Sequence, residues 1–438
     1  TENGSMTQFW VPTHQWRTIC LCSCLGLDQT RGGEYGAFKD LVTQFIGALR
    51  NCDIHPYVVF DGCADFSALK WRTGRRRALE RMQRAHHAAQ SGRNAAVLPA
   101  LIWEVFRQTL HRLKVPLARS YTEADRQVAA LAQEWGCPVL SNDSDFAIFP
   151  LTRGMLHIAH FKWKNVQQRE GLSFIPCKTY LSSRFCETVH IDPQLLPVFA
   201  VLAGNDYTKN MAGGAGDTSR DISPVVPDWM RRPVIEAQFS SDFLDVLTNQ
   251  RVGLSVVVDH KDKPSANQVS LPLRRVLYGL LLGTGRTVEE RDRDGLEVIF
   301  PQVQTDSSVS PQLSLQSLPQ VSLFFLQTAV EQRRQVLLNA LGVSQLSSLP
   351  SHLSDLVLPL AATCFWLKEA TPPPDPSLLK ALLIGWCRGD TLPEETGLGQ
   401  DLDKDWCHWL NQWQSCLRDS FLLNQLLGAP LPEPPMAR

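Results

Sequence analysis

Short apolar runs that end in polar turns recur in the first half of the chain, separated by stretches with helical periodicity. The runs 56–62 (PYVVFDG) and 138–140 (PVL) are apolar on both faces, which is typical of strands buried in a parallel sheet. Residues 34–51 and 99–113 instead place their apolar side chains on one helical face. This alternation predicts an α/β fold with a parallel sheet flanked by helices.

Further elements follow the same alternation. Residues 116–121 (PLARSY) predict a short strand and residues 122–135 the next helix. Residues 153–165 favour a hairpin or an edge strand. Residues 192–203 predict an apolar helix, and Gly204 suits its C-terminus.

The second half of the chain reads differently. After a stretch rich in Gly, Ser, Asp and Pro at 211–228, the pattern predicts a mostly α-helical region. Its expected helices span 271–283, 321–342, 352–369, 377–389 and 402–428. Polar residues at about 301–320 predict a linker, and TPPPDP at 371–376 predicts a rigid one. The last helix is rich in Trp and Leu, which indicates a core helix or a partner surface.

Acidic residues stand at or beside the ends of the predicted strands and helices. They are Asp61, Glu123, Asp125, Asp143, Asp145 and Asp206. Ligand sites in open α/β sheets lie beyond the carboxyl ends of the strands, so we expect these acids to surround one cleft.

Local structure offers an alternative for some of these acids. Asp143 and Asp145 also suit a solvated Asx turn. Thr122 and Asp125 have the spacing of a weak capping box, and Glu123 would favour the positive end of the same helix.

Six carboxylates on one rim would repel one another strongly unless cations lay between them. Hard carboxylate ligands suit Mg²⁺ or Mn²⁺. Two such ions about 4 Å apart are the arrangement that hydrolyses phosphodiesters. The acids therefore predict a two-metal site.

A basic segment follows the strand that ends at Asp61. Residues 70–93 hold a single acid, Glu80, against Lys70, Arg72, Arg75, Arg76, Arg77, Arg81, Arg84 and Arg93. Helix formers dominate residues 75–90, so we place these charges on a helix, with Arg77 and Arg81 towards the acids and Lys70 nearby. The segment is either a solvated helix face or a phosphate-binding surface, and its place after an acidic strand end favours the second.

The bulk composition limits the classes of protein. The chain has 438 residues, enough for two or three domains, and its net charge of −1 gives no global attraction to nucleic acid. No apolar run reaches the length of a membrane span. The 12 cysteines lack zinc-site spacing and indicate free thiols in a reducing compartment.

The order of these motifs resembles the flap-endonuclease/XPG family of structure-specific nucleases. VVFDG, a basic helix, EAD, SNDSDF and GNDY follow one another as in that family. Within it, TEADRQVAALAQEWGCPVLSNDSDFAIF, LLPVFAVLAGNDY, PLRRVLYGLLL and WQSCLRDSFLLNQLL are most similar to the asteroid branch.

The resemblance implies a PIN-like nuclease domain and a metal-dependent endonuclease of single-stranded or overhanging DNA with a role in DNA repair. It implies that Asp61, Glu123 and Asp125 bind the first metal and that Asp143, Asp145 and Asp206 bind the second. Lys70 and Arg77 match its substrate-gripping residues, with Arg76 and Arg81 beside them. It further implies a nuclear location, with the cytoplasm as the alternative, no membrane, and a repair protein as partner of the helical half.

The N-terminus departs from the family. The family opens with Met-Gly-Ile/Val and a first strand that ends in a metal-binding Asp, whereas residues 1–18 show neither, and residues 1–10 (TENGSMTQFW) indicate no helix or strand. The expected division is therefore 1–18, an atypical N-terminus; 19–212, the nuclease domain; and 213–438, the asteroid-type helical region.

Three functions remain open. The acids favour a DNA nuclease. The absent first-strand Asp favours an impaired enzyme or a non-catalytic DNA-binding repair scaffold. The Trp-rich helical half favours a protein that works through a partner.

Overall fold

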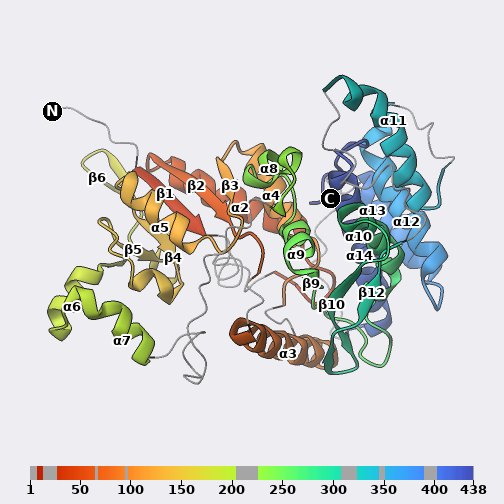
Figure 1. The fold of residues 1–438 in the computed structure, drawn as a ribbon. Coiled ribbons are helices and arrows are strands. Elements are labelled where there is room, and N and C mark those ends of the chain that lie inside the picture. Colours follow the sequence, from red (N-terminus) through yellow and green to blue (C-terminus); the bar gives the residue numbers. More distant parts are fainter. Residues whose placement is uncertain are drawn as a thin grey trace.

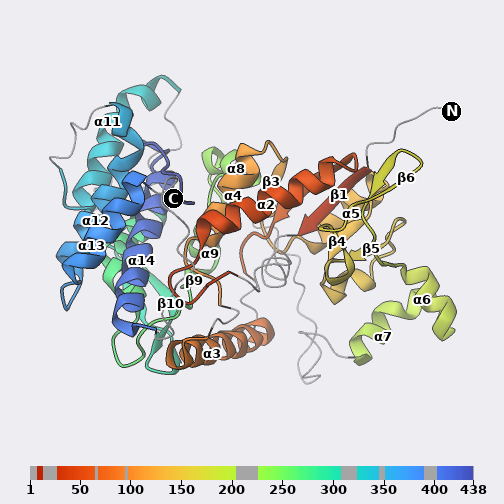
Figure 2. The same cartoon turned by 180° about the vertical axis from the view of Figure 1, so that it is seen from behind.

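The structure, a computed structural model, places a sheet-based half beside a helical half. It describes residues 7–12, 27–64, 68–93, 97–203, 225–306, 323–344, 351–388 and 402–437. The sheet lies on one side of the molecule and helices α10 to α14 on the other, with α8 and α9 between them (Figure 1). The same arrangement is seen from behind in Figure 2.

The first half is built on a six-stranded sheet with the order β3-β2-β1-β4-β5-β8. Its strands are β1 (Thr7–Pro12), β2 (Ile54–Phe60), β3 (Leu117–Arg119), β4 (Val139–Ser141), β5 (Met155–His157) and β8 (Thr179–Tyr180). All neighbours from β3 to β5 are parallel, and only β8 is antiparallel to its neighbour. The strands predicted around 56–62, 116–121 and 138–140 are present.

The expectation that residues 1–10 form no helix or strand is wrong from Thr7 onward, where the strand segment Thr7–Pro12 begins. This segment is β1, which lies between β2 and β4 and pairs along its whole length with β2. Phe9, Trp10 and Val11 are strand formers, but the run is only three residues long and follows a polar stretch, so sequence periodicity does not reveal it. Pairing on both sides supplies what the local pattern lacks.

Helices cover both faces of the sheet. Val58 and Phe60 of β2 pack in one core with α2 (Tyr35–Arg50) and α4 (Ile102–Arg112). Val59, which points the other way, packs in a second core with α5 (Asp125–Glu134). The expected fold class, a parallel sheet flanked by helices, is confirmed.

The segment 153–165 is not a hairpin or an edge strand, contrary to expectation. Its strand β5 lies inside the sheet between β4 and β8. The hairpin comes later in the chain and is formed by β6 (Gln167–Arg169) and β7 (Leu172–Phe174). Strand β5 is three residues long, and its alternation was too short to show that both edges are paired.

The helical second half is confirmed. Its helices are α8 (Asp228–Ile235), α9 (Ser241–Asn249), α10 (Leu271–Leu282), α11 (Leu323–Ala340), α12 (Val357–Glu369), α13 (Pro376–Arg388) and α14 (Lys404–Leu426). It also holds a small four-stranded sheet that the sequence analysis did not predict. Its strands are β9 (Arg251–Gly253), β10 (Thr287–Asp294), β11 (Glu297–Ile299) and β12 (Gln302–Gln304), the last within the expected linker 301–320.

The central strand of this small sheet, β10, has the sequence TVEERDRD, which looks like a solvated segment. Its inward positions are Val288, Glu290 and Asp292, and all three side chains are buried. Buried acids are tolerated only where partners compensate their charge. Arg274 on α10 supplies a bidentate partner for Glu290, with N–O distances of 2.6 and 2.9 Å.

The Trp- and Leu-rich helix α14 is a core helix. Almost all of its residues from Cys407 onward are buried, Trp413 and Leu417 among them. One continuous hydrophobic core joins α14, α10 and α2. The two halves of the chain therefore share buried surface across the predicted boundary near residue 212, and that boundary stays a prediction.

Among the described residues, no helix combines the length and the apolar character needed to cross a membrane.

Candidate active site

The carboxyl edge of the large sheet carries acidic residues from neighbouring parallel strands. Asp61 directly follows β2, and Asp143 comes two residues after β4. Both strands pair with β1 and run in the same direction, so their carboxyl ends meet at one edge. In Figure 1 the arrow of β1 ends at this edge, in the middle of the molecule.

The turn after β2 is held in place by the loop after β3. The Gly62 amide donates to the Thr122 carbonyl at 2.8 Å, and the Cys63 amide to the Tyr121 carbonyl at 2.9 Å. A Cβ atom at position 62 would lie 2.2 Å from the Ser120 carbonyl oxygen. Only glycine allows this approach, which explains the Gly of the FDG motif.

The same loop brings Glu123 and Asp125 to Asp61. The Ala124 amide at the start of α5 donates to the Asp61 carboxylate at 3.0 Å. The N-cap residue of α5 is Ala124, and no side chain caps the helix. The capping-box alternative for Thr122 and Asp125 is therefore wrong, because Asp61 takes the amide at this helix end.

The turn after β4 places Asp143 and Asp145. The Asp143 side chain is the N-cap of the 3₁₀ helix η1 (Ser144–Ala147) and accepts the Asp145 amide at 3.1 Å. The Asx-turn alternative thus accounts for the hydrogen bond that one carboxylate oxygen of Asp143 accepts. Its carboxylate is half-buried, while Asp145 is exposed.

The acids lie close enough together for their charges to act on Asp125. Burial raises the pKa of Asp125 from 3.8 to about 8. Negative charge on four neighbours adds to this rise: Asp61, Asp143, Glu123 and Asp145. Desolvation and like charges both disfavour an ionised carboxylate. Five of the six predicted acids therefore share one electrostatic environment.

The chemistry of this donor set fits a hard divalent cation, because all five groups are carboxylates and ionising Asp125 among them is unfavourable without a compensating positive charge. Over the described ranges, no group of three or more His, Cys, Asp and Glu side chains has the arrangement of a metal site. The two observations are compatible, since Coulomb repulsion acts well beyond the 2.0–2.1 Å of a Mg²⁺–oxygen bond.

Strand β1 contributes no acid to this edge. It ends at Pro12, between β2 with Asp61 and β4 with Asp143. The following residues of the sequence are Thr13 and His14, and no acid occurs between Glu2 and Asp28. Strand β1 is thus present in the sheet with Pro12, and not an acid, as its last residue.

The structure does not describe the side chains of two predicted site residues. Asp206 falls outside the described residues. Lys70 belongs to helix α3 (Ala68–Ser91), but its side chain is not among the described ones.

The basic segment is a helix, as predicted. Its apolar side chains Ala78, Met82, Ala85 and Ala89 are buried. Arg76 and Arg77 are exposed, and Arg81 is half-buried. In Figures 1 and 2, α3 lies below the sheet and the small sheet of the second half.

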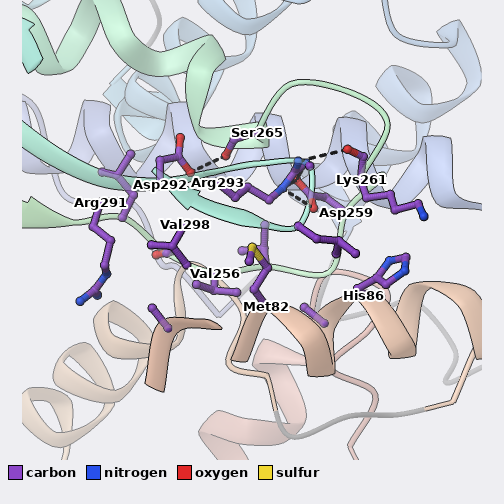
Figure 3. A pocket seen from close by; sticks show the side chains of 17 residues that line it. Met82, His86, Val256, Asp259, Lys261, Ser265, Arg291, Asp292, Arg293 and Val298 are labelled. Atoms are coloured by element: carbon purple, nitrogen blue, oxygen red, sulfur yellow. Dashed lines mark hydrogen bonds and ion pairs between the residues drawn. The ribbon is translucent and has the colours of Figure 1, made fainter. Parts of the chain in front are cut away.

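A pocket between α3 and the small sheet shows how this helix is held. Met82 of α3 and Val256 and Val298 of the second half line it (Figure 3). Its Arg293 is paired with Asp259, and its Asp292 accepts the Ser265 hydroxyl at 2.7 Å. Because these charged groups have partners within the protein, we interpret the pocket as the packing interface that turns the arginines of α3 outward.

Two residues that the sequence analysis did not single out contact the Asp61 turn. Arg119 at the end of β3 donates to the Asp61 carbonyl at 2.6 Å. Asp245 of α9 accepts the Ala64 amide at 2.7 Å. A strand-end position marks Arg119 in the sequence, but nothing local marks Asp245, since 181 residues separate it from Ala64.

Comparison with known proteins shows which family the chain belongs to. A protein from Danio rerio named single-strand DNA endonuclease ASTE1 is 33% identical over 95% of this chain and 74% of its own length. The chain belongs to the asteroid family. The human protein of the same name is 29% identical, over 95% of this chain and 78% of its own.

Other matches to this asteroid-family chain are more partial. Protein asteroid of Drosophila melanogaster is 28% identical over 51% of the chain and 33% of its own length. The family model described as the asteroid N-terminal domain matches residues 394–438, which include α14. A solved structure titled the catalytic core of Rad2 in complex with DNA substrate is 20% identical, covers 48% of this chain and 59% of its own, and has a TM-score of 0.33.

Proposed function

We propose that this protein is a DNA endonuclease that hydrolyses phosphodiesters of single-stranded or overhanging DNA. The observation that carries the proposal is the cluster of acids around Asp125, whose pKa is raised to about 8 by burial and by its acidic neighbours. The name of the ASTE1 relatives, single-strand DNA endonuclease, supports the substrate class.

In this proposal the acids hold two divalent cations, Mg²⁺ or Mn²⁺. Asp61, Glu123 and Asp125 hold the first, and Asp143, Asp145 and Asp206 the second. Bound there, the cations supply an activated water and stabilise the leaving oxyanion. The loop after β3 orients Asp61 through Gly62 and Ala124, while Lys70, Arg76, Arg77 and Arg81 on α3 bind the DNA phosphates.

The proposal extends beyond the reaction. It includes a role in DNA repair, a nuclear location that follows from the DNA substrate, and a repair protein as partner of the helical half.

A second function, a DNA-binding repair scaffold without catalysis, is favoured by the missing acid of β1. A first-metal site short of one carboxylate binds its cation more weakly. We therefore expect this chain to cleave DNA slowly, and cleavage of a labelled overhang substrate in Mg²⁺, Mn²⁺ or EDTA distinguishes the two functions. Cleavage that EDTA does not stop would contradict the metal-dependent proposal.

Metal binding should be visible as stability. We expect Mn²⁺ to raise the free energy of unfolding, by about 2.7 kcal/mol where free Mn²⁺ is about 100 times its Kd. Asp125→Asn should raise the stability of the metal-free protein, because it removes a carboxylate that burial and its neighbours disfavour, and should abolish most of the Mn²⁺ effect. Denaturant unfolding with and without Mn²⁺ measures both.

The control for this experiment is Asp40→Asn, at an exposed position of α2 outside the acid cluster. It should change neither the metal-free stability nor the gain from Mn²⁺. If Asp125→Asn behaves like this control, Asp125 is not part of a cation site.

DNA binding should depend on α3. We expect Arg77→Ala with Arg81→Ala to weaken binding of single-stranded DNA and to lower the slope of log K against log salt by about 1.4, since each phosphate contact contributes about 0.7. Fluorescence anisotropy over a range of salt concentrations, without divalent cations, measures the slope.

A matched double variant removes the same charge elsewhere. Lys368 on α12 and Lys380 on α13 are exposed in the helical half. Replacing both with Ala should leave the slope unchanged. Equal slopes for the two double variants would mean that α3 is an ordinary solvated helix.

A further inference from the structure

The turn that carries Asp61 is held by hydrogen bonds from both halves of the chain. On one side it bonds to the loop after β3, as described above. On the other side, the Ala64 amide donates to Asp245 at 2.7 Å, and the Asn249 side-chain amide donates to the Ala64 carbonyl at 3.4 Å. Asp245 and Asn249 both belong to α9, beyond the predicted domain boundary.

Asp245 is placed rigidly enough to act as an anchor. Asp245 is 9% exposed and lies among the buried residues of α9, together with Phe243 and Leu244. Burial, followed by the charge of Asp242, raises the pKa of the Asp245 carboxyl well above 3.8. An Asn side chain at this position would keep an oxygen that can accept the Ala64 amide.

Helix α9 is itself tied to the end of the chain. Asp242 forms an ion pair with Arg418 of α14, and Arg418 also contacts Asp419 at 3.1 Å. Asp419 in turn pairs with the buried Arg274 at 3.1 Å. A connected series of charged groups thus runs from α14 and α10 to the helix that holds Ala64.

Arg119 adds a further hydrogen bond to the same turn. Its guanidinium donates to the Asp61 carbonyl at 2.6 Å and lies 5.2 Å from the ring centroid of Phe60. Burial lowers its pKa to about 10, and nearby acids, among them Asp61 and Asp242, partly offset this. The residue thus lies within the electrostatic reach of both the strand end and α9.

We propose that Asp245 is a positioning residue of the nuclease centre: it holds the Ala64 amide and so fixes the turn that aims the Asp61 carboxylate at its cation. This inference rests on the proposed function, in which Asp61 is a metal ligand. It makes the helical half a working part of the active site.

The physical reason is geometric. Asp61 reaches the cluster from a short turn with no regular secondary structure, and two of that turn's contacts come from α9. Without the Asp245 acceptor, the Ala64 amide loses its partner and the turn can shift. Residues that orient metal ligands typically change metal affinity by about 10- to 100-fold when they are removed.

The test is a Mn²⁺ titration of the full chain, followed by the electron paramagnetic resonance of free Mn²⁺, which requires no cleavage. Asp245→Ala should raise the Mn²⁺ Kd by about 10- to 100-fold. Asp245→Asn should stay close to the parent, because the amide oxygen still accepts the Ala64 amide. DNA affinity without divalent cations should be the same in all three proteins.

The matched control is Asp292→Ala. Asp292 is 8% exposed and accepts hydrogen bonds from Ser265, Asn267 and Gln268, all within the second half. It should lower stability without changing the Mn²⁺ Kd. Asn249→Ala, at a half-buried site, should raise the Kd by about two- to fivefold, and it decides the question if Asp245→Ala does not fold.

The outcomes separate the two proposals. A parent chain that binds no Mn²⁺ overturns the proposed function, and the positioning role with it. A parent that binds Mn²⁺ beside Asp245→Ala and Asn249→Ala variants with an unchanged Kd overturns the positioning role alone. So does an Asp245→Asn variant as impaired as Asp245→Ala, because the hydrogen bond would then not be the cause.

Discussion

Asp143→Ala is expected to slow the proposed metal-dependent cleavage of single-stranded DNA by about 100-fold or more. Asp143 stands at the carboxyl end of β4, half-buried, and its charge contributes to the raised pKa of Asp125. Removing it deprives the proposed second cation of a ligand, and positional errors of about 1 Å can already cost on the order of 100-fold in rate. Single-turnover cleavage of a labelled overhang in Mn²⁺ measures the loss.

Asp143 also caps η1, so the cap and the charge must be separated. Asp143→Asn keeps a side-chain oxygen for the Asp145 amide and should be nearly as inactive as Asp143→Ala. Asp375→Ala removes a similar local bond, from the Ser377 amide at 2.7 Å, ahead of α13 in the helical half. It should retain full activity. An active Asp143→Asn variant would reduce Asp143 to a turn-forming residue.

The sequence reveals the acidic edge because each part of it is local. VVFDG and PVLSND each join a buried apolar run to a carboxylate within a few residues, and parallel strands bring such ends together. The bonds that hold the edge are less visible. The hydrogen bond from the Ala124 amide to the Asp61 carboxylate depends on the close approach at Gly62. The spacing of Thr122 and Asp125 alone suggests a capping box instead.

Two features depend on contacts that no local pattern records. Strand β1 holds an apolar run of only three residues, Phe9 to Val11, and becomes a central strand because β2 and β4 pair with it. Strand β10 directs Glu290 into the core, where its partner Arg274 lies 16 residues away on α10. In both cases the stabilising groups lie on other elements, so hydropathy periodicity gives the wrong result.

The position of β1 changes what its missing acid means. The strand is present, paired on both sides, and lies between the two that carry Asp61 and Asp143. We interpret β1 as the first strand expected from the family resemblance, so that the departure lies in the residues near its end. Since Pro12 pairs with Val59, and Asp61 comes two residues after Val59, the same count along the sequence from Pro12 reaches His14.

An acid introduced after β1 should therefore increase activity. We expect either Thr13→Asp or His14→Asp to accelerate cleavage of overhanging DNA in Mg²⁺ or Mn²⁺ by up to about 100-fold, because an added ligand for the proposed first cation would improve the placement of the reacting water. The same variant should bind Mn²⁺ more tightly than the parent. Cleavage rates and Mn²⁺ titration measured on one preparation test both effects.

The gain in cleavage rate should depend on the acid cluster. Asp143→Ala in the faster variant should remove it, and Thr13→Asn or His14→Asn should not reproduce it, because a carboxamide supplies no negative charge. A parent chain already as fast as the Asp variants would show that β1 needs no acid for catalysis. A gain that survives Asp143→Ala would exclude the two-metal arrangement and leave the acids at the edge without a shared role.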